Sequence, residues 1–290
     1  MDNVENDVIN RLMTWGDRQA RVRAVLLTSS RAGSGAPVDI LSDYDPILYV
    51  TDTAPFINDE GWLREFGDIM VMFRDQWEEY GMRQYTRLVL YDDGTKIDFT
   101  IAPVGALEKV LEEPALPDHL DIGYRVLLDK DQLTGRMPPP SYRAHIPSKP
   151  TEHEFRNLVE QFWWDSTYVA KHLWRNELFP AKYMLDYVLK LDCLRRMLEW
   201  SIEITHDWSL RPGKEGRWLR QWLPREVWSA LEDTFVGAAI EDNWQALFRT
   251  TEVFRATALS VARNLGYEYP QQVDANVSAY LQKIRALGNV

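Results

Sequence analysis

Cysteine is almost missing from this 290-residue sequence, since Cys193 is the only one. A disulfide within the chain is therefore impossible, and a cysteine-based metal site is excluded. The sequence also lacks any run of the roughly 18 apolar residues that a transmembrane helix requires. Its first ten residues, MDNVENDVIN, are polar and acidic, which is unlike a secretory signal. These absences predict a cytoplasmic protein that has no membrane partner.

The sequence has fewer basic than acidic residues. It contains 33 Lys and Arg and 44 Asp and Glu, which gives a net charge of -11. Residues 1–150 contribute -9 (16 basic, 25 acidic) and residues 151–290 contribute -2 (17 basic, 19 acidic). A protein that binds polyanionic nucleic acid usually carries a basic face. We therefore expect no nucleic-acid partner and an attraction for metal ions or a cationic small molecule. The alternative is that the acidity only keeps the protein soluble.

The first half of the sequence alternates helical and strand-like patterns. A helical pattern from about Val4 to Gln19 comes first, and NDEGWLREFG (58–67) predicts a short helix. The sequence DDG at 92–94 predicts the turn of a hairpin. Strand-length apolar segments occupy residues 22–28, 44–50, 68–73, 86–93, 95–103 and 125–131.

A proline-rich stretch, GRMPPPSYRAHIPSKP (135–150), separates this half from a helical half. Thr151 and Glu154 then form a capping-box pattern, which predicts a helix start. We therefore predict an α+β fold. Its domains are 1–135, a small mixed β-sheet flanked by helices; 136–150, a linker; and 151–290, an all-α helical bundle. The expected helices span residues 151–177, 180–204, 224–236, 241–265 and 271–287.

Three aspartates in the first half predict a metal site. Asp43 and Asp45 lie two residues apart, so on a strand both carboxylates project from one face and repel each other. Asp98 lies inside the apolar segment KIDFTI, where a carboxylate is costly unless it is satisfied. If the two strands are neighbours, the three acids converge on an oxygen-only site of the kind that Mg²⁺ prefers. Asp98 is also placed to accept a proton as a general base.

A serine-rich turn follows the first predicted strand. Ser29 and Ser30 end that strand, and Arg31 opens a glycine-containing loop. Backbone N–H groups and hydroxyls at such a turn hold phosphate well, and an arginine adds a charged fork. Because the turn lies upstream of the aspartates, we predict that Ser29, Ser30 and Arg31 bind phosphate, which the family resemblance described next implies is that of a nucleotide.

These motifs together carry a family resemblance. LTSSRAGSGAPVDILSDYDPILYV followed by KIDFTI resembles the nucleotidyltransferase superfamily that includes DNA polymerase β. The resemblance narrows to the aminoglycoside 6-adenylyltransferases, also called streptomycin adenylyltransferases, and is co-linear over nearly the whole chain. The segments that carry the narrower resemblance are FGDIMVMF, DDGTKIDFTI, EFRNLVEQFWWDSTYVAKHLWRNELFPAKYMLD, MLEW and NWQALFRTTEVFRATALSVARNLGYEYP.

The resemblance implies transfer of AMP from Mg-ATP to a hydroxyl of a cationic aminoglycoside, most simply the 6-hydroxyl of streptomycin. Two Mg²⁺ ions are implied, with Asp43 and Asp45 ligating both and Asp98 serving as ligand or as base. Residues 1–135 would be the catalytic domain and 151–290 the domain that binds nucleotide and acceptor. The protein would be a monomer or a homodimer.

Candidate binding residues in the helical half lie on one face of a predicted helix. Trp164, Tyr168, Lys171 and Arg175 follow the spacing i, i+4, i+7, i+11. By resemblance, Lys171 and Lys182 would bind phosphates, while Trp164, Asp165, Tyr168 and Asp186 would line the acceptor pocket. The alternatives are an aromatic stripe packed in the core and a solvated charged face.

Two positions depart from the family pattern. Ser29 replaces the first glycine of the usual Gly-Ser pair, and Pro46 directly follows Asp45. Proline removes a hydrogen-bond donor from the sheet and is best tolerated on an edge strand or at a bulge. Neither change removes an acid. The remaining alternatives are another hydroxylated acceptor, including another aminoglycoside, a metabolite or a protein side chain, and a nucleotide-binding module with little turnover.

Overall fold

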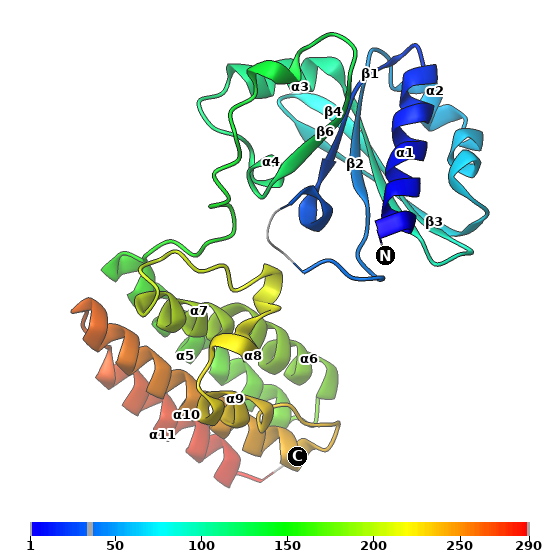
Figure 1. Ribbon diagram of the computed structural model, residues 1–290. Helices are drawn as coiled ribbons and strands as arrows, with labels where there is room; N and C mark the ends of the chain where they lie inside the picture. The colour runs from blue at the N-terminus through cyan, green and yellow to red at the C-terminus, as the bar shows by residue number, and fades with distance from the viewer. Residues whose placement is uncertain (1, 34–36, 289–290) are drawn as a thin grey trace. The chain divides into compact units, whose positions relative to one another are not determined.

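The protein is described by a computed structural model that covers residues 2–33 and 37–288, without the side chains of residues 2–6. The chain forms two compact units, Met1–Ala144 and His145–Val290 (Figure 1). No helix in the described part of the chain is both long and apolar enough to cross a membrane.

A six-stranded mixed sheet forms the centre of the first unit, in the order β3-β4-β5-β2-β1-β6. Four neighbouring pairs are antiparallel, and β2 and β5 alone run parallel. The two strands that carry the aspartates are therefore neighbours. The strands span Val22–Thr28 (β1), Asp45–Val50 (β2), Ile69–Glu79 (β3), Met82–Tyr91 (β4), Lys96–Pro103 (β5) and Tyr124–Asp129 (β6).

Helices cover both faces of this sheet (Figure 1). One face packs on helix α1 (Asp2–Arg18), helix α2 (Ala54–Asn58) and the 3₁₀ helix η2 (Gly61–Phe66) through an aromatic core that includes Trp15 and Phe99. The other face packs on α3 (Val104–Glu112) and α4 (Asp118–Asp121). Two further 3₁₀ turns are η1 (Ser29–Ala32) and η3 (Thr134–Arg136).

The α+β class is confirmed, but several element predictions need correction. The helix predicted from Asn58 or Asp59 is a 3₁₀ helix that starts at Gly61, after the short α2, and ends before Gly67, whose φ of 147° is outside helical geometry. Strand β3 extends well past Phe73, since it pairs with β4 along a hairpin that turns at Tyr80 and Gly81. Helices α3 and α4 follow β5 at positions for which no helix was predicted.

The second unit is all helical, as predicted. Thr151 caps its first helix with the complete capping box: Thr151 Oγ1 accepts from Glu154 N–H, and the Glu154 carboxylate accepts from Thr151 N–H. The predicted helix 180–204 is divided into an α-helix, a π-helix (η4) and another α-helix. The helices are α5 (Glu152–Trp174), α6 (Leu178–Lys182), η4 (Tyr183–Leu194), α7 (Arg195–Ile204), η5 (Lys214–Gly216, 3₁₀), α8 (Leu219–Trp222), α9 (Arg225–Glu232), α10 (Ile240–Leu265) and α11 (Gln271–Ala286).

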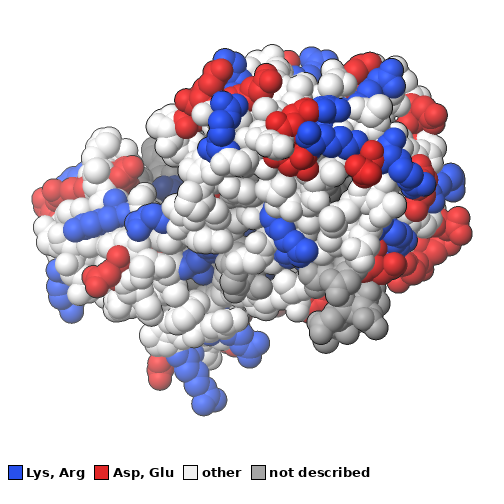
Figure 2. All heavy atoms as spheres, turned by 45° about the horizontal axis from the view of Figure 1, so that its top comes forward, with Lys and Arg blue, Asp and Glu red and all other residues white. Residues whose placement is uncertain are grey.

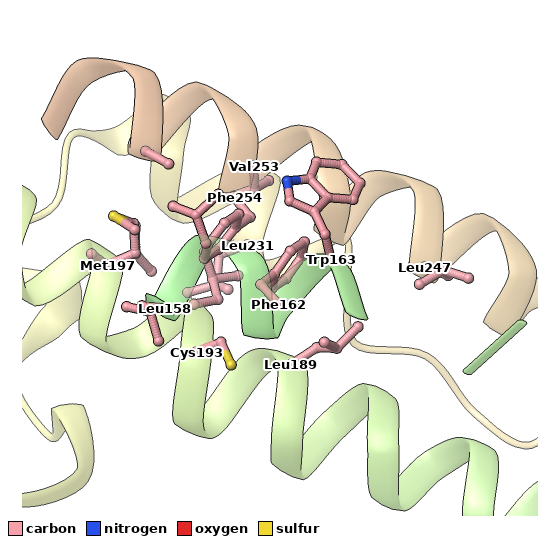
Figure 3. Close-up of a cluster of buried hydrophobic side chains, with 14 of the residues drawn as sticks. Leu158, Phe162, Trp163, Leu189, Cys193, Met197, Leu231, Leu247, Val253 and Phe254 are labelled. Carbon is pink, nitrogen blue, oxygen red and sulfur yellow. The ribbon is translucent and has the colours of Figure 1, made fainter. Parts of the chain in front are cut away.

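The core of this unit forms where α5, η4, α7 and α10 meet (Figure 3). Phe162 and Phe254 stack with ring centroids 3.7 Å apart and planes within 3°. Cys193 is buried and unbonded in this core, as its apolar surroundings predict. Burial of so many large apolar side chains supplies the driving force for folding of this unit.

Acidic and basic side chains are interspersed over the face of the molecule shown in Figure 2. Within the first unit, Arg74 and Arg87 both bond the Glu60 carboxylate. The net charge is therefore not expressed as one single-sign surface on that face.

Candidate active site

The parallel pairing of β2 with β5 brings two of the predicted acids side by side. Ile47 lies opposite Thr100, and Tyr44 forms a bridge to Ile97 at the same register. Tyr44 N–H donates to the Lys96 carbonyl (3.0 Å), and Asp98 N–H donates to the Tyr44 carbonyl (2.8 Å). This register places Asp45 beside Asp98 and Asp43 beside Lys96.

Lys96 is the site residue that the sequence argument missed. Its Nζ lies 2.7 Å from Asp43 Oδ2 and 3.2 Å from Asp98 Oδ2, so the ammonium holds the two carboxylates together. Lys96 and Asp98 are two residues apart on one strand, so the spacing argument used for Asp43 and Asp45 would have found it. Within residues 2–33 and 37–288, no group of three acidic, His or Cys side chains forms a ready-made metal site.

The carboxylates are nevertheless left short of partners. Burial, followed by the charges of Asp98 and Asp43, raises the pKa of Asp45 to about 6, although Ser29 and Lys96 oppose this. Burial also raises the pKa of Asp98 although Lys96 opposes it, and Asp98 Oδ1 is buried with no hydrogen-bond partner among the residues that the structure describes. Repelling, desolvated carboxylates with a spare oxygen suit a divalent cation. The metal-ligand roles of Asp43, Asp45 and Asp98 stay predictions.

The serine turn lies directly beside these acids, because Thr28 pairs with Asp45 across β1 and β2. Ser29 has φ 61°, in the left-handed region that favours glycine, and hydrogen-bonds the Asp45 side chain. A left-handed residue before a 3₁₀ turn directs successive N–H groups toward one side, the arrangement that binds anions. Ser29 and Ser30 are therefore well placed for phosphate.

Arg31 is engaged with its own loop. Its guanidinium donates to the Ser42 carbonyl through Nη2 (2.9 Å) and Nε (3.1 Å) and to the Asp39 carbonyl (3.2 Å). The same group lies over the Tyr44 ring, 4.1 Å from its centroid. Arg31 thus fixes the approach to Asp43, and its predicted phosphate contact stays a prediction.

Pro46 is the second residue of β2, where a proline removes one hydrogen-bond donor from the sheet. Strand β2 is central, and Pro46 pairs with Leu27 in regular register. The next rung of the parallel ladder would run from residue 46 N–H to the Asp98 carbonyl, which proline cannot provide. The proline is tolerated because it stands at the second residue of the strand, where the regular ladder with β5 begins only at Ile47.

On α5 of the helical unit, the predicted stripe is continuous. The Trp164 and Tyr168 rings meet edge to face at 6.2 Å, and Lys171 Nζ lies 4.3 Å from the Tyr168 centroid. Trp164 is 64% exposed, so the alternative that it packs in the core is wrong. Arg175 ends the helix on the surface. Asp165 is half-buried, and burial followed by the charge of Asp192 raises its pKa.

Lys182 and Asp186 belong to a closed ion cluster. The Asp186 carboxylate lies 2.6 Å from Lys182 Nζ and 2.7 Å from Lys190 Nζ. Lys182 also donates to the Val236 carbonyl (3.0 Å), and buried Lys190 donates to the Thr234 carbonyl (2.6 Å). The cluster therefore ties η4 to the segment after α9. Contacts of Lys182 with phosphate and of Asp186 with acceptor stay predictions.

The family model described as streptomycin adenylyltransferase matches residues 3–284. The chain belongs to the streptomycin adenylyltransferase family. Membership makes it a nucleotidyltransferase and confirms the resemblance drawn from the motifs.

Members of this family resemble the chain over almost their full length. An aminoglycoside 6-adenylyltransferase of Bacillus subtilis (strain 168) is 29% identical over 284 residues, 97% of each chain. One from Campylobacter jejuni is 30% identical over 281 residues, 96% of this chain and 94% of the relative. The crystal structure of an aminoglycoside 6-adenyltransferase from Bacillus subtilis aligns with 27% identity and a TM-score of 0.46, covering 96% of this chain and 97% of that one.

Proposed function

We propose that this protein transfers AMP from Mg-ATP to a hydroxyl of an aminoglycoside, with the 6-hydroxyl of streptomycin as the favoured acceptor. The acceptor oxygen would form a bond to the α-phosphorus while the bond to the β-phosphate bridging oxygen breaks, releasing pyrophosphate. The observation that carries the proposal is the juxtaposition of Asp45 and Asp98 on β2 and β5, with their carboxylates underpartnered.

In this proposal Asp43, Asp45 and Asp98 hold two divalent metal ions. Bound metal would supply charge neutralisation at the phosphates and acidify the attacking hydroxyl. The side chains themselves would position the substrates and accept the proton of the attacking hydroxyl. Asp98 Oδ1, buried and without a partner, suits either metal ligation or acceptance of the hydroxyl proton. Lys96 must yield part of its contact with Asp43 and Asp98 when a metal ion takes those oxygens.

The serine turn would orient the phosphates. Ser29 and Ser30 present a left-handed residue followed by a 3₁₀ turn, adjacent to Asp45. We assign catalysis to residues 1–135, the connection to 136–150, and nucleotide and acceptor binding to 151–290. In the last of these, exposed Trp164 offers a ring surface to the acceptor.

The test is pyrophosphate release from Mg-ATP across a panel of aminoglycosides, run beside Asp45→Asn. We expect release with streptomycin and none in the variant. Asp75→Asn, on exposed β3, is the matched control and should release pyrophosphate at the rate of the unmodified protein. If pyrophosphate were released only with an acceptor other than streptomycin, that acceptor would replace streptomycin as the proposed substrate. Tight ATP binding without release for any acceptor would reject the resistance-enzyme proposal and favour a nucleotide-binding module.

A further inference from the structure

An apolar surface of the first unit lies beside Asp98, on the same face of the sheet. Phe73 of β3 pairs with Leu88 of β4, and Leu88 in turn pairs with Asp98 of β5. Residues that lie directly opposite each other on neighbouring strands project from the same face. The three side chains therefore form one row that runs from the edge of the sheet to the acid.

The outer part of this surface is exposed. Phe73 is 62% exposed, and Val71, two residues earlier on the same face of β3, is 57% exposed. Val71 pairs with Leu90, and both Leu88 and Leu90 are half-buried. Val71, Phe73, Leu88 and Leu90 together form an apolar platform. The core that α3 and α4 build on this face takes its buried strand residues from β1, β2 and β5, and none of its described members comes from β3.

The platform contributes little to the stability of the sheet. Strand β4 is anchored by its other face, where Val89 and Tyr91 are buried in the aromatic core with Trp15 and Phe99. The exposed ring of Phe73 gains little burial from the fold. Apolar side chains that gather on an exposed surface commonly mark a binding site.

The strand order decides which part of a bound substrate can reach the platform. The serine turn follows β1, Asp45 and Asp98 lie on β2 and β5, and the platform lies on β4 and β3. The turn and the platform are therefore on opposite sides of the acids. In phosphoryl transfer the attacking and leaving oxygens lie roughly in line, on opposite sides of the phosphorus. If the serine turn holds the leaving phosphates, the attacking hydroxyl approaches from the platform.

The chemistry of the platform fits a saturated ring that carries cationic groups. The face of an aromatic ring attracts guanidinium and ammonium groups, and leucine side chains pack against ring C–H groups. Phe73 is two strands, about 10 Å, from Asp98, which leaves room for one six-membered ring and a substituent between them. Asp75, the next residue of β3 on this face, already accepts from Gln76 N–H (2.8 Å).

We propose that Phe73 determines acceptor specificity. Its ring stacks on a cationic substituent of the acceptor, while the ring that carries the attacking hydroxyl lies over Leu88, next to Asp98. The acceptor class is thus a polyhydroxylated ring with guanidinium or ammonium groups. This inference rests on the proposed function, and it adds a contact from the first unit to those assigned to residues 151–290.

The test compares full-length Phe73→Ala with the unmodified protein, using streptomycin or whichever aminoglycoside the acceptor panel identifies. Steady-state kinetics with each substrate varied in turn give both KM values, and isothermal titration gives the Kd of the acceptor. We expect KM and Kd for the acceptor to rise about tenfold, because a cation–π contact is lost, and KM for ATP to stay unchanged. Phe73→Tyr should restore the affinity, and Phe73→Leu, which keeps apolar area without an aromatic face, should fall between.

A matched control separates this contact from a general loss of apolar surface. Met13→Ala removes a side chain that is 39% exposed on α1, and α1 covers the opposite face of the sheet. Both KM values should be unchanged in this variant. Thermal melts of Phe73→Ala should match those of the unmodified protein, because the ring is exposed.

Unchanged acceptor affinity in Phe73→Ala, while the unmodified protein transfers AMP, would overturn the inference and leave the proposed function intact. A rise in KM for ATP alone would assign the platform to the nucleobase and would also reject the inference. Acceptor binding that depends on Phe73 but leads to no transfer would uphold the platform and reject the function. If the unmodified protein bound no aminoglycoside, both proposals would be wrong.

Discussion

Two aspartate sites in this protein are satisfied to very different degrees. In the helical unit, Asp274 receives both forks of Arg255 (2.6 and 2.7 Å) and the Tyr269 hydroxyl (2.7 Å). Although burial opposes it, these bonds lower the pKa of Asp274. In the first unit, burial raises the pKa of Asp45 and Asp98, and one Asp98 oxygen has no partner. A satisfied acid stabilises its fold, whereas an unsatisfied one keeps bonding capacity for a ligand.

The largest expected effect comes from removing charge at the unsatisfied site. Asp45→Asn should lower adenylyl transfer by about a thousandfold, because metal binding and phosphate charge neutralisation depend on the carboxylate. The same variant should unfold at a higher temperature in EDTA, since it relieves repulsion with Asp43 and Asp98. Steady-state kinetics and thermal melts of one preparation measure both effects. If Asp45→Asn were less stable than the unmodified protein and still active, Asp45 would be a structural acid and not an unsatisfied ligand-binding one.

Removing the charge of Asp274, the satisfied aspartate, should destabilise the fold instead of stabilising it. Asp274→Ala leaves the Arg255 guanidinium and the Tyr269 hydroxyl without their partner, so we expect a loss of about 3 kcal/mol in the free energy of unfolding. Urea denaturation in EDTA and in Mg²⁺ should give the same loss. A loss that depended on Mg²⁺ would show that this site is not purely structural.

The pH dependence of stability distinguishes the two sites as well. The folded pKa of Asp45, about 6, lies above the ordinary value of 3.8, so between these values the folded state holds more protons than the unfolded state. Its contribution to the free energy of unfolding therefore falls as pH rises through this window, by up to about 2 kcal/mol. Urea titrations from pH 4 to pH 7 in EDTA, compared with Asp45→Asn, isolate this contribution. Parallel curves for the two proteins would contradict it.

The smallest expected effect concerns Lys96, whose ammonium is partly exposed. Lys96→Met should lower the metal-free free energy of unfolding by about 1 kcal/mol or less, because the pair with Asp43 is screened by solvent. Saturating Mg²⁺ should remove most of this difference, and Mg²⁺ should bind the variant more tightly because a competing cation is gone. Lys96→Arg keeps the charge and serves as control. Weaker Mg²⁺ binding by Lys96→Met would mean that the lysine orients the ligands instead of competing with the metal.

Local chemistry made part of this structure predictable. The Thr151 capping box depends on residues three apart, and β1 depends on one apolar run between polar turns, so each is written into a short segment. The short helix expected from Asn58 or Asp59 is present as the 3₁₀ helix η2, but it starts only at Gly61 and ends before Gly67, which has φ 147°. The position of Pro46 in a central strand could not be read from the sequence, because it depends on where the ladder with β5 begins.

The sequence by itself determined the two-part α+β character, the aspartate spacing and the serine turn, because periodicity and turn chemistry act over a few residues. Only the tertiary structure decided which charges meet. Lys96 reaches Asp43 across 53 residues, and Lys190 takes Asp186 together with a carbonyl 44 residues away. It also committed Arg31 to its own loop, where its guanidinium donates to the Ser42 carbonyl. Such outcomes depend on strand register and helix packing, and distant parts of the chain settle these together.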